Sequence, residues 1–170
     1  MAINTTLSAP AQVISPEELL QHWQGHRQLT RRVIVAFPED KLFNYSIGGM
    51  RPFAGLAEEL TGLASGGIKG VATGKWPQIN ELEHHSEKPL PTTKEEILKQ
   101  WDEVTEEIEA LWPQITPERF HEVEKAFGMY EGPIYANLLY LVDNEIHHRG
   151  QGYVYLRSLG IEPPPFWDRF

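Results

Sequence analysis

Four stretches of helical periodicity, separated by proline and glycine, constrain the fold of this 170-residue chain more than any other feature. In each stretch apolar residues recur every three or four positions, which places them on one face of an α-helix. A helix with an apolar face buries it against another element, and the 41% hydrophobic content is enough for one core. The sequence therefore predicts an all-α fold, a four-helix bundle of the up-and-down type.

Local signals set the helix boundaries. Ser15 and Thr93 each stand three residues before a glutamate, which is the capping box that opens a helix. Pro113 cannot continue a helix, and Gly74 and Gly160 suit the left-handed conformation that closes one. The predicted helices span residues 16–37, 52–73, 94–112 and 133–159.

The domain organisation is simple. Residues 1–14 are small and polar, without the basic and apolar regions of a secretion signal, and we expect a disordered or extended lead-in. Residues 15–170 form one predicted domain. Within it, residues 75–91 lack periodicity and predict a long surface connection whose Trp76 folds back on the bundle.

Composition excludes several classes of function. The formal net charge of −9 repels nucleic-acid phosphates and anionic lipids, and no stretch is apolar enough to cross a membrane. The chain has no cysteine, which excludes disulfides and thiolate metal sites and is typical of a reducing compartment. We expect a cytoplasmic protein that binds neither nucleic acid nor membrane.

The last predicted helix carries two kinds of surface. The apolar residues that share one seam are Leu139, Val142, Ile146, Gly150 and Tyr153. A second seam is unusually polar and consists of Asn137, Leu141, Asn144, His148, Gln151 and Tyr155. Because polar side chains inside a bundle need partners, this seam predicts a cavity, with Asn137, Gln151 and Tyr155 lining the pocket.

Three segments resemble one known family. Residues 143–157 read DNEIHHRGQGYVYLR, residues 49–53 read GMRPF, and residues 72–76 read ATGKW. Together they resemble the DinB-like family, also called YfiT-like or damage-inducible. The resemblance implies a bundle of four long helices, commonly a homodimer, that holds a divalent metal ion with three histidines.

The metal pattern of that family is incomplete in this chain. The resemblance places the ligands at positions 59, 144 and 148, where this sequence has Glu59, Asn144 and His148. Carboxylate and amide oxygens beside one imidazole suit a hard or borderline ion better than tightly bound zinc. The possible ions are nickel, zinc and manganese. The alternative is that no metal binds, that His148 and Asn144 are hydrogen-bonded core residues, and that Glu59 is solvated.

Other histidines and charges give weaker signals. His22 and His26 stand four residues apart and could form a separate site, although such residues are more often boundary residues of a helix. Arg149 is interpreted as an ion-pair partner of a nearby carboxylate. His84 and His85 have no partner at ligand spacing.

Two hypotheses about function remain open. The first is a metal-dependent enzyme that acts on a small molecule, as a thiol S-transferase or a hydrolase, which rests on the resemblance. The second is a metal-free protein that binds a small ligand or serves a stress response. Nucleophile-elbow, phosphate-loop and dinucleotide motifs are missing from the sequence, so classical hydrolase and nucleotide chemistry is not expected.

Overall fold

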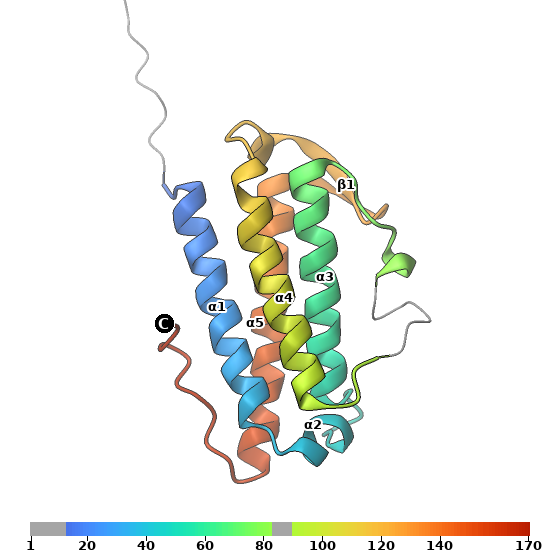
Figure 1. Ribbon diagram of the computed structural model, residues 1–170, viewed down its shortest axis with the longest axis vertical. Coiled ribbons are helices and arrows are strands. Elements are labelled where there is room, and N and C mark those ends of the chain that lie inside the picture. Colours follow the sequence, from blue (N-terminus) through green and yellow to red (C-terminus); the bar gives the residue numbers. More distant parts are fainter. Residues whose placement is uncertain (1–12, 83–89) are drawn as a thin grey trace, which may run out of the picture.

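The computed structural model describes residues 13–82 and 90–170, and it contains a bundle of four long helices (Figure 1). These helices are α1 (Pro16–Ala36), α3 (Phe53–Thr73), α4 (Lys94–Leu111) and α5 (Ile134–Ser158). The predicted capping boxes at Ser15 and Thr93 are present, and Gly74 closes α3 with a φ of 72°. The all-α bundle is confirmed. Most of the predicted lead-in, residues 1–12, lies outside the described residues.

The order of the helices includes a crossover. Phe37, after α1, stacks on Phe53 at the start of α3 with 4.8 Å between ring centroids. Lys94, at the start of α4, donates to the Phe37 carbonyl at 2.6 Å. At the opposite end Arg119, which follows α4, donates to the carbonyl of Val71 near the end of α3. Helices α3 and α4 therefore run in the same direction, while α1 and α5 run against them (Figure 1).

Short elements close both ends of the bundle. They are α2 (Glu39–Asn44), the 3₁₀ turns Ile79–Glu81, Trp112–Gln114 and Arg119–His121, and the strands β1 (Val123–Ala126) and β2 (Tyr130–Pro133). The strands pair antiparallel, with Val123 opposite Pro133 and Ala126 opposite Tyr130. This hairpin lies across the end of the bundle where α3 finishes (Figure 1).

The hairpin was not predicted, and its turn explains why. Phe127 and Gly128 have φ values of 53° and 71°, and the Met129 amide donates to the Ala126 carbonyl at 3.0 Å. Two residues with positive φ make the turn that matches strand twist, and asparagine or glycine usually occupies the first position. Phe127 is held there by tertiary packing, since its buried ring meets Trp76 edge to face at 5.4 Å. The expected return of Trp76 to the bundle is confirmed.

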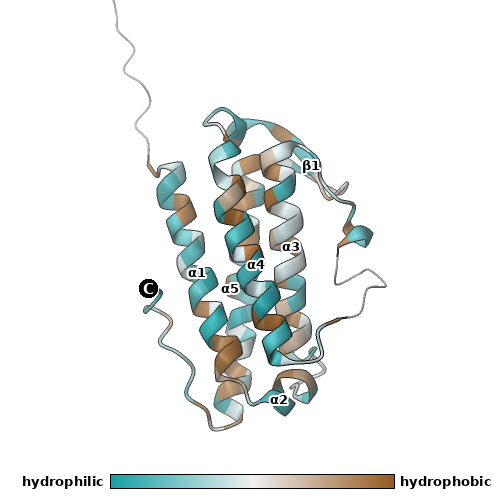
Figure 2. Ribbon diagram, in the orientation of Figure 1, coloured by the Kyte–Doolittle hydropathy of each residue, from teal (hydrophilic) through white to brown (hydrophobic). Residues whose placement is uncertain are grey.

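Apolar side chains fill the bundle in two clusters. One cluster surrounds Trp23, Ile68 and Leu138, and the other surrounds Phe53 and Trp101. Hydrophobic and hydrophilic residues both recur along α4, as expected for a helix with one buried face (Figure 2). In the described residues, every helix is too short or too polar to span a lipid bilayer.

The apolar seam of α5 is partly exposed, and several polar residues of the helix are buried. Leu139 is 43% exposed and Ile146 is 40% exposed, whereas Glu145, His148 and Arg149 are buried. Val142 of the same seam is buried, and polar residues can also face the interior where other helices supply hydrogen-bond partners. Those partners cannot be seen in a projection of one helix. The homodimer, which would cover the exposed side, stays a prediction.

Two glycines of α5 provide a test of the packing between α3 and α5. A Cβ atom on Gly152 would lie 2.4 Å from Cε2 of Phe53, whereas one on Gly150 would meet nothing within 4 Å. We expect Gly152→Ala to lower the free energy of unfolding by about 1–3 kcal/mol through overpacking. Gly150→Ala should raise it by about 0.5–1 kcal/mol, because alanine favours an exposed helix. Urea unfolding of both variants checks this, and equal effects would contradict the packing described.

Candidate functional site

Two of the three positions that the resemblance selects meet between α3 and α5. Glu59 Oε1 lies 3.1 Å from His148 Nε2, and the side chains are 18% and 11% exposed. Glu59 sits in the first turns of α3, while His148 is in the second half of α5. Because these helices run antiparallel, the two side chains come together from segments that are 89 residues apart.

A third charged residue, Arg51, completes this cluster. Its guanidinium forms an ion pair with Glu59 Oε2, on the side of the carboxylate away from His148. The Arg51 carbonyl accepts a hydrogen bond from the Tyr155 hydroxyl at 2.9 Å, which fixes the loop before α3. We refer to Arg51, Glu59 and His148 as the charge cluster. The sequence analysis missed the role of Arg51, whose one signal was its place in the GMRPF segment.

The electrostatics of the charge cluster are mutually consistent. The hydrogen bond with His148, together with the Arg51 guanidinium, lowers the pKa of Glu59 to about 2. The same hydrogen bond raises the pKa of His148 above its ordinary value, although burial opposes this. Each partner therefore favours the charged form of the other.

Gln151 lies within hydrogen-bonding distance of both His148 and His147. His148 Nδ1 lies 2.9 Å from Gln151 Oε1, and Gln151 Nε2 lies 3.3 Å from His147 Nε2. Asn144, one helical turn before His148, has a buried Nδ2 atom without a hydrogen-bond partner among the described residues. Gln151 thus orients the imidazole, while no hydrogen bond joins Asn144 to the charge cluster among the described residues.

These residues do not fit the metal ion that the resemblance implies. Both oxygens of Glu59 and both ring nitrogens of His148 already have partners. The hydrogen bond with Glu59 raises the pKa of His148, and protonation of the ring removes the lone pair that a metal needs. Across residues 13–82 and 90–170, no three His, Asp or Glu side chains gather closely enough to hold an ion. The Arg51 guanidinium places a positive charge beside the Glu59 carboxylate.

A cavity of about 510 Å³ lies beside the charge cluster, and Glu59 is part of its wall. Its other lining residues come from α3, the segment after it, the hairpin and the first half of α5. They are Leu63, Trp76, Ile79, Ala126, Phe127, Tyr130, Glu131, Gly132, Pro133, Ala136, Asn137, Tyr140 and Leu141. Among the predicted pocket residues, Asn137 lines this cavity. Gln151 contacts His148 instead, and Tyr155 is fully buried in the core.

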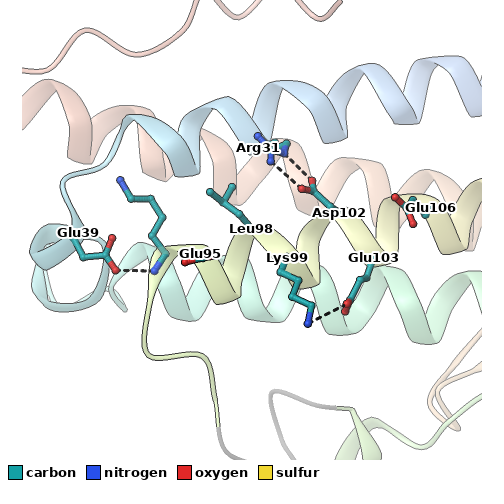
Figure 3. A pocket seen from close by; sticks show the side chains of 9 residues that line it. Arg31, Glu39, Glu95, Leu98, Lys99, Asp102, Glu103 and Glu106 are labelled. Atoms are coloured by element: carbon teal, nitrogen blue, oxygen red, sulfur yellow. Dashed lines mark hydrogen bonds and ion pairs between the residues drawn. The ribbon is translucent and has the colours of Figure 1, made fainter.

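A second hollow, of about 650 Å³, lies along α1 and α4 on another side of the molecule (Figure 3). Most of its charged side chains already have partners. Arg31 Nε lies 2.7 Å from Asp102 Oδ1, and Lys99 Nζ lies 3.9 Å from Glu103 Oε1. These exposed pairs, together with the absence of any predicted site residue from its lining, indicate a surface groove.

The other predicted residues have structural partners. Arg149 donates to His26 Nδ1 at 2.8 Å and lies 3.7 Å from the Glu145 carboxylate, so the expected ion pair is present. His26 is buried, and its ring centroid lies 4.6 Å from that of His22 in a T-shaped contact. His84 and His85 lie outside the described residues.

Comparisons with known proteins establish the family and the fold. The model of the DinB family matches residues 3–169 of the sequence. The chain belongs to the DinB family. Among curated proteins no match was found.

Two solved structures resemble this DinB-family chain. A DinB-like protein from Bacillus cereus ATCC 10987 aligns with a TM-score of 0.69 and 22% identity, over 88% of this chain and 95% of that one. A DinB-like protein from Bacillus subtilis aligns with a TM-score of 0.70 and 18% identity, over 89% and 99%. At such low identity the likeness establishes the shared fold.

The charge cluster predicts a characteristic dependence of stability on pH. Glu59 has a lowered pKa in the folded state, so its contribution is present above about pH 4.5 and is lost as the pH falls toward 2. His148 has a raised pKa, so its contribution is complete below about pH 6.5 and is lost as the pH rises through the folded-state value. A double-mutant cycle with Glu59→Gln and His148→Gln should give a coupling of about 0.5–2 kcal/mol between pH 4.5 and 6.5.

The coupling should decline on both sides of that window. Chemical unfolding of the four proteins at pH 3, 5.5 and 9 measures it. A coupling that stays constant over this range would show that the two side chains interact without charge.

Proposed function

We propose that this DinB-family chain binds a small molecule in the cavity beside the charge cluster and does so without a metal ion. The proposal rests on the ion pairs that Glu59 forms with Arg51 and His148. They lie where the resemblance implies a metal centre. A closed cluster of charges has no open coordination position for a substrate.

The position of the cavity supports a role in binding. Its wall is mostly apolar and aromatic, with a few polar groups at Glu59, Glu131 and Asn137. This combination is the usual composition of a small-molecule site, and a volume of about 510 Å³ is within the usual range. The buried Nδ2 atom of Asn137 lacks a partner among the described residues, so a ligand with an acceptor oxygen would satisfy it.

The charge cluster has a defined task in this proposal. Arg51 and His148 hold the Glu59 carboxylate in place, and Gln151 holds His148. Glu59 then forms a fixed acidic edge of the cavity. The metal-dependent enzyme, either a thiol S-transferase or a hydrolase, is the alternative, and metal analysis separates the two.

The proposal predicts that metal loading fails in the wild-type protein. After incubation with nickel, zinc or manganese and dialysis, elemental analysis should find less than one ion per chain, and thermal stability should not change. A variant with Glu59→His, Asn144→His and Arg51→Ala has three histidines at the ligand positions, His148 included. It should bind one ion and be stabilised by that ion.

A matched control places the histidine on a neighbouring residue of the same helix. Glu58→His with Asn144→His and Arg51→Ala has the same composition but turns the new imidazole away, and it should not gain an ion. One ion per wild-type chain, lost in His148→Ala, would overturn the metal-free proposal and favour the enzyme.

Filling the cavity should abolish ligand binding. Ala136 lines the cavity and has a small side chain, so Ala136→Phe should remove much of its volume. Compounds that raise the melting temperature of the wild-type protein in a mixed library should have no effect on this variant. Val154→Phe is the control, because Val154 is exposed on the same helix away from the cavity. Hits that persist in Ala136→Phe would place the ligand elsewhere.

A further inference from the structure

Four aromatic side chains from three separate segments line the cavity. Trp76 follows α3, Phe127 and Tyr130 belong to the hairpin, and Tyr140 is on α5. The rings of Trp76 and Phe127 meet edge to face at 5.4 Å, and those of Tyr130 and Tyr140 stack at 6.4 Å. The cavity wall thus offers π faces or edges from several directions.

Hydrogen bonding and backbone packing fix Trp76 in this wall. Its Nε1 donates to Glu124 Oε2 at 2.6 Å, and Arg119 holds the same carboxylate. A Cβ atom on Gly70 would lie 2.2 Å from Cδ2 of Trp76, so the indole lies directly on the α3 backbone. The ring is therefore positioned before any ligand arrives, which lowers the entropic cost of binding.

The charges that line the cavity have one sign. Glu59 and Glu131 are acidic, and no Lys, Arg or His belongs to the lining formed by the described residues. Arg51 and His148 offset Glu59 from behind, but Glu131 has no ion pair among residues 13–82 and 90–170. Burial, with smaller contributions from Tyr130 and Glu59, raises the pKa of Tyr140. The net charge of −9 adds attraction for cations at longer range.

We propose that the ligand is a small organic cation, an alkylated ammonium group seated against these aromatic rings with Glu131 at its side. Aromatic faces attract such cations through their quadrupole, and apolar substituents on nitrogen suit an apolar wall. The free amide of Asn137 adds a contact for an oxygen on the same ligand. This inference rests on the proposed function and specifies the class of ligand for that cavity.

Choline and its neutral isostere 3,3-dimethyl-1-butanol provide the test, because they have the same shape and hydroxyl group and differ in charge. Titration calorimetry with the full chain should show that choline binds more tightly, by about 3-fold to 30-fold, which corresponds to one cation–π contact at a partly exposed site.

Three variants locate the source of this preference. Tyr140→Leu removes a ring that is 53% exposed, so the fold should persist, and Glu131→Gln removes the unpaired charge. Each should reduce the preference for choline at least 2-fold. Glu109→Gln removes the same charge from an exposed position on α4 and should leave the preference unchanged.

Equal affinities for choline and the isostere would overturn the cation inference while leaving the binding of small molecules intact. The inference is also overturned if neither compound binds at millimolar concentration. In that case the proposed function is tested separately, by the compound library on the wild-type protein and Ala136→Phe. A preference that survives both Tyr140→Leu and Glu131→Gln would place the cation outside this cavity and overturn the inference as well.

Discussion

Buried charges at the centre of the bundle determine how its helices meet. Thr30 on α1 donates to Glu145 of α5 at 2.6 Å and accepts from Arg149 at 3.0 Å. Burial raises the pKa of Glu145 and lowers that of Arg149, so leaving water disfavours both charged forms. Arg27, stacked 3.6 Å from the Trp101 ring centroid, binds the carbonyl of the same residue and links α1 to α4. Because a buried charge without its partner is costly, these contacts favour one register of the helices.

This register also determines the candidate site. Once α5 is fixed against α1, its opposite side brings His148 to Glu59 on α3, and Gly152 lets the Phe53 ring lie against the α5 backbone. The loop that enters α3 then brings Arg51 to the same carboxylate. Two polar networks therefore lie on two sides of one helix. The inner network orders the bundle, while the outer one borders the cavity between α5, the hairpin and Trp76.

Much of the fold follows from local signals, and much of the site does not. The helix ends at Ser15, Thr93 and Gly74 come from capping chemistry that involves a few neighbouring residues, so sequence alone predicts them. The hairpin turn at Phe127 depends on packing against Trp76, which is 51 positions away in the sequence, and was missed. The resemblance selected Glu59 and His148 as neighbours, but whether a metal lies between them depends on Arg51, whose position comes from the loop before α3.

By itself the sequence determined four amphipathic helices, their ends, a negative surface and an incomplete set of metal ligands. The helices and their ends depend on spacing within one segment, the charge depends on composition, and the ligand positions come from the resemblance to the DinB family. The tertiary structure decided which polar residues of α5 face inward, that α3 and α4 run parallel, and that aromatic rings from three segments share a cavity with Glu59. These depend on contacts between distant segments, where partners from other helices offset the cost of burying polar groups that a single segment cannot satisfy.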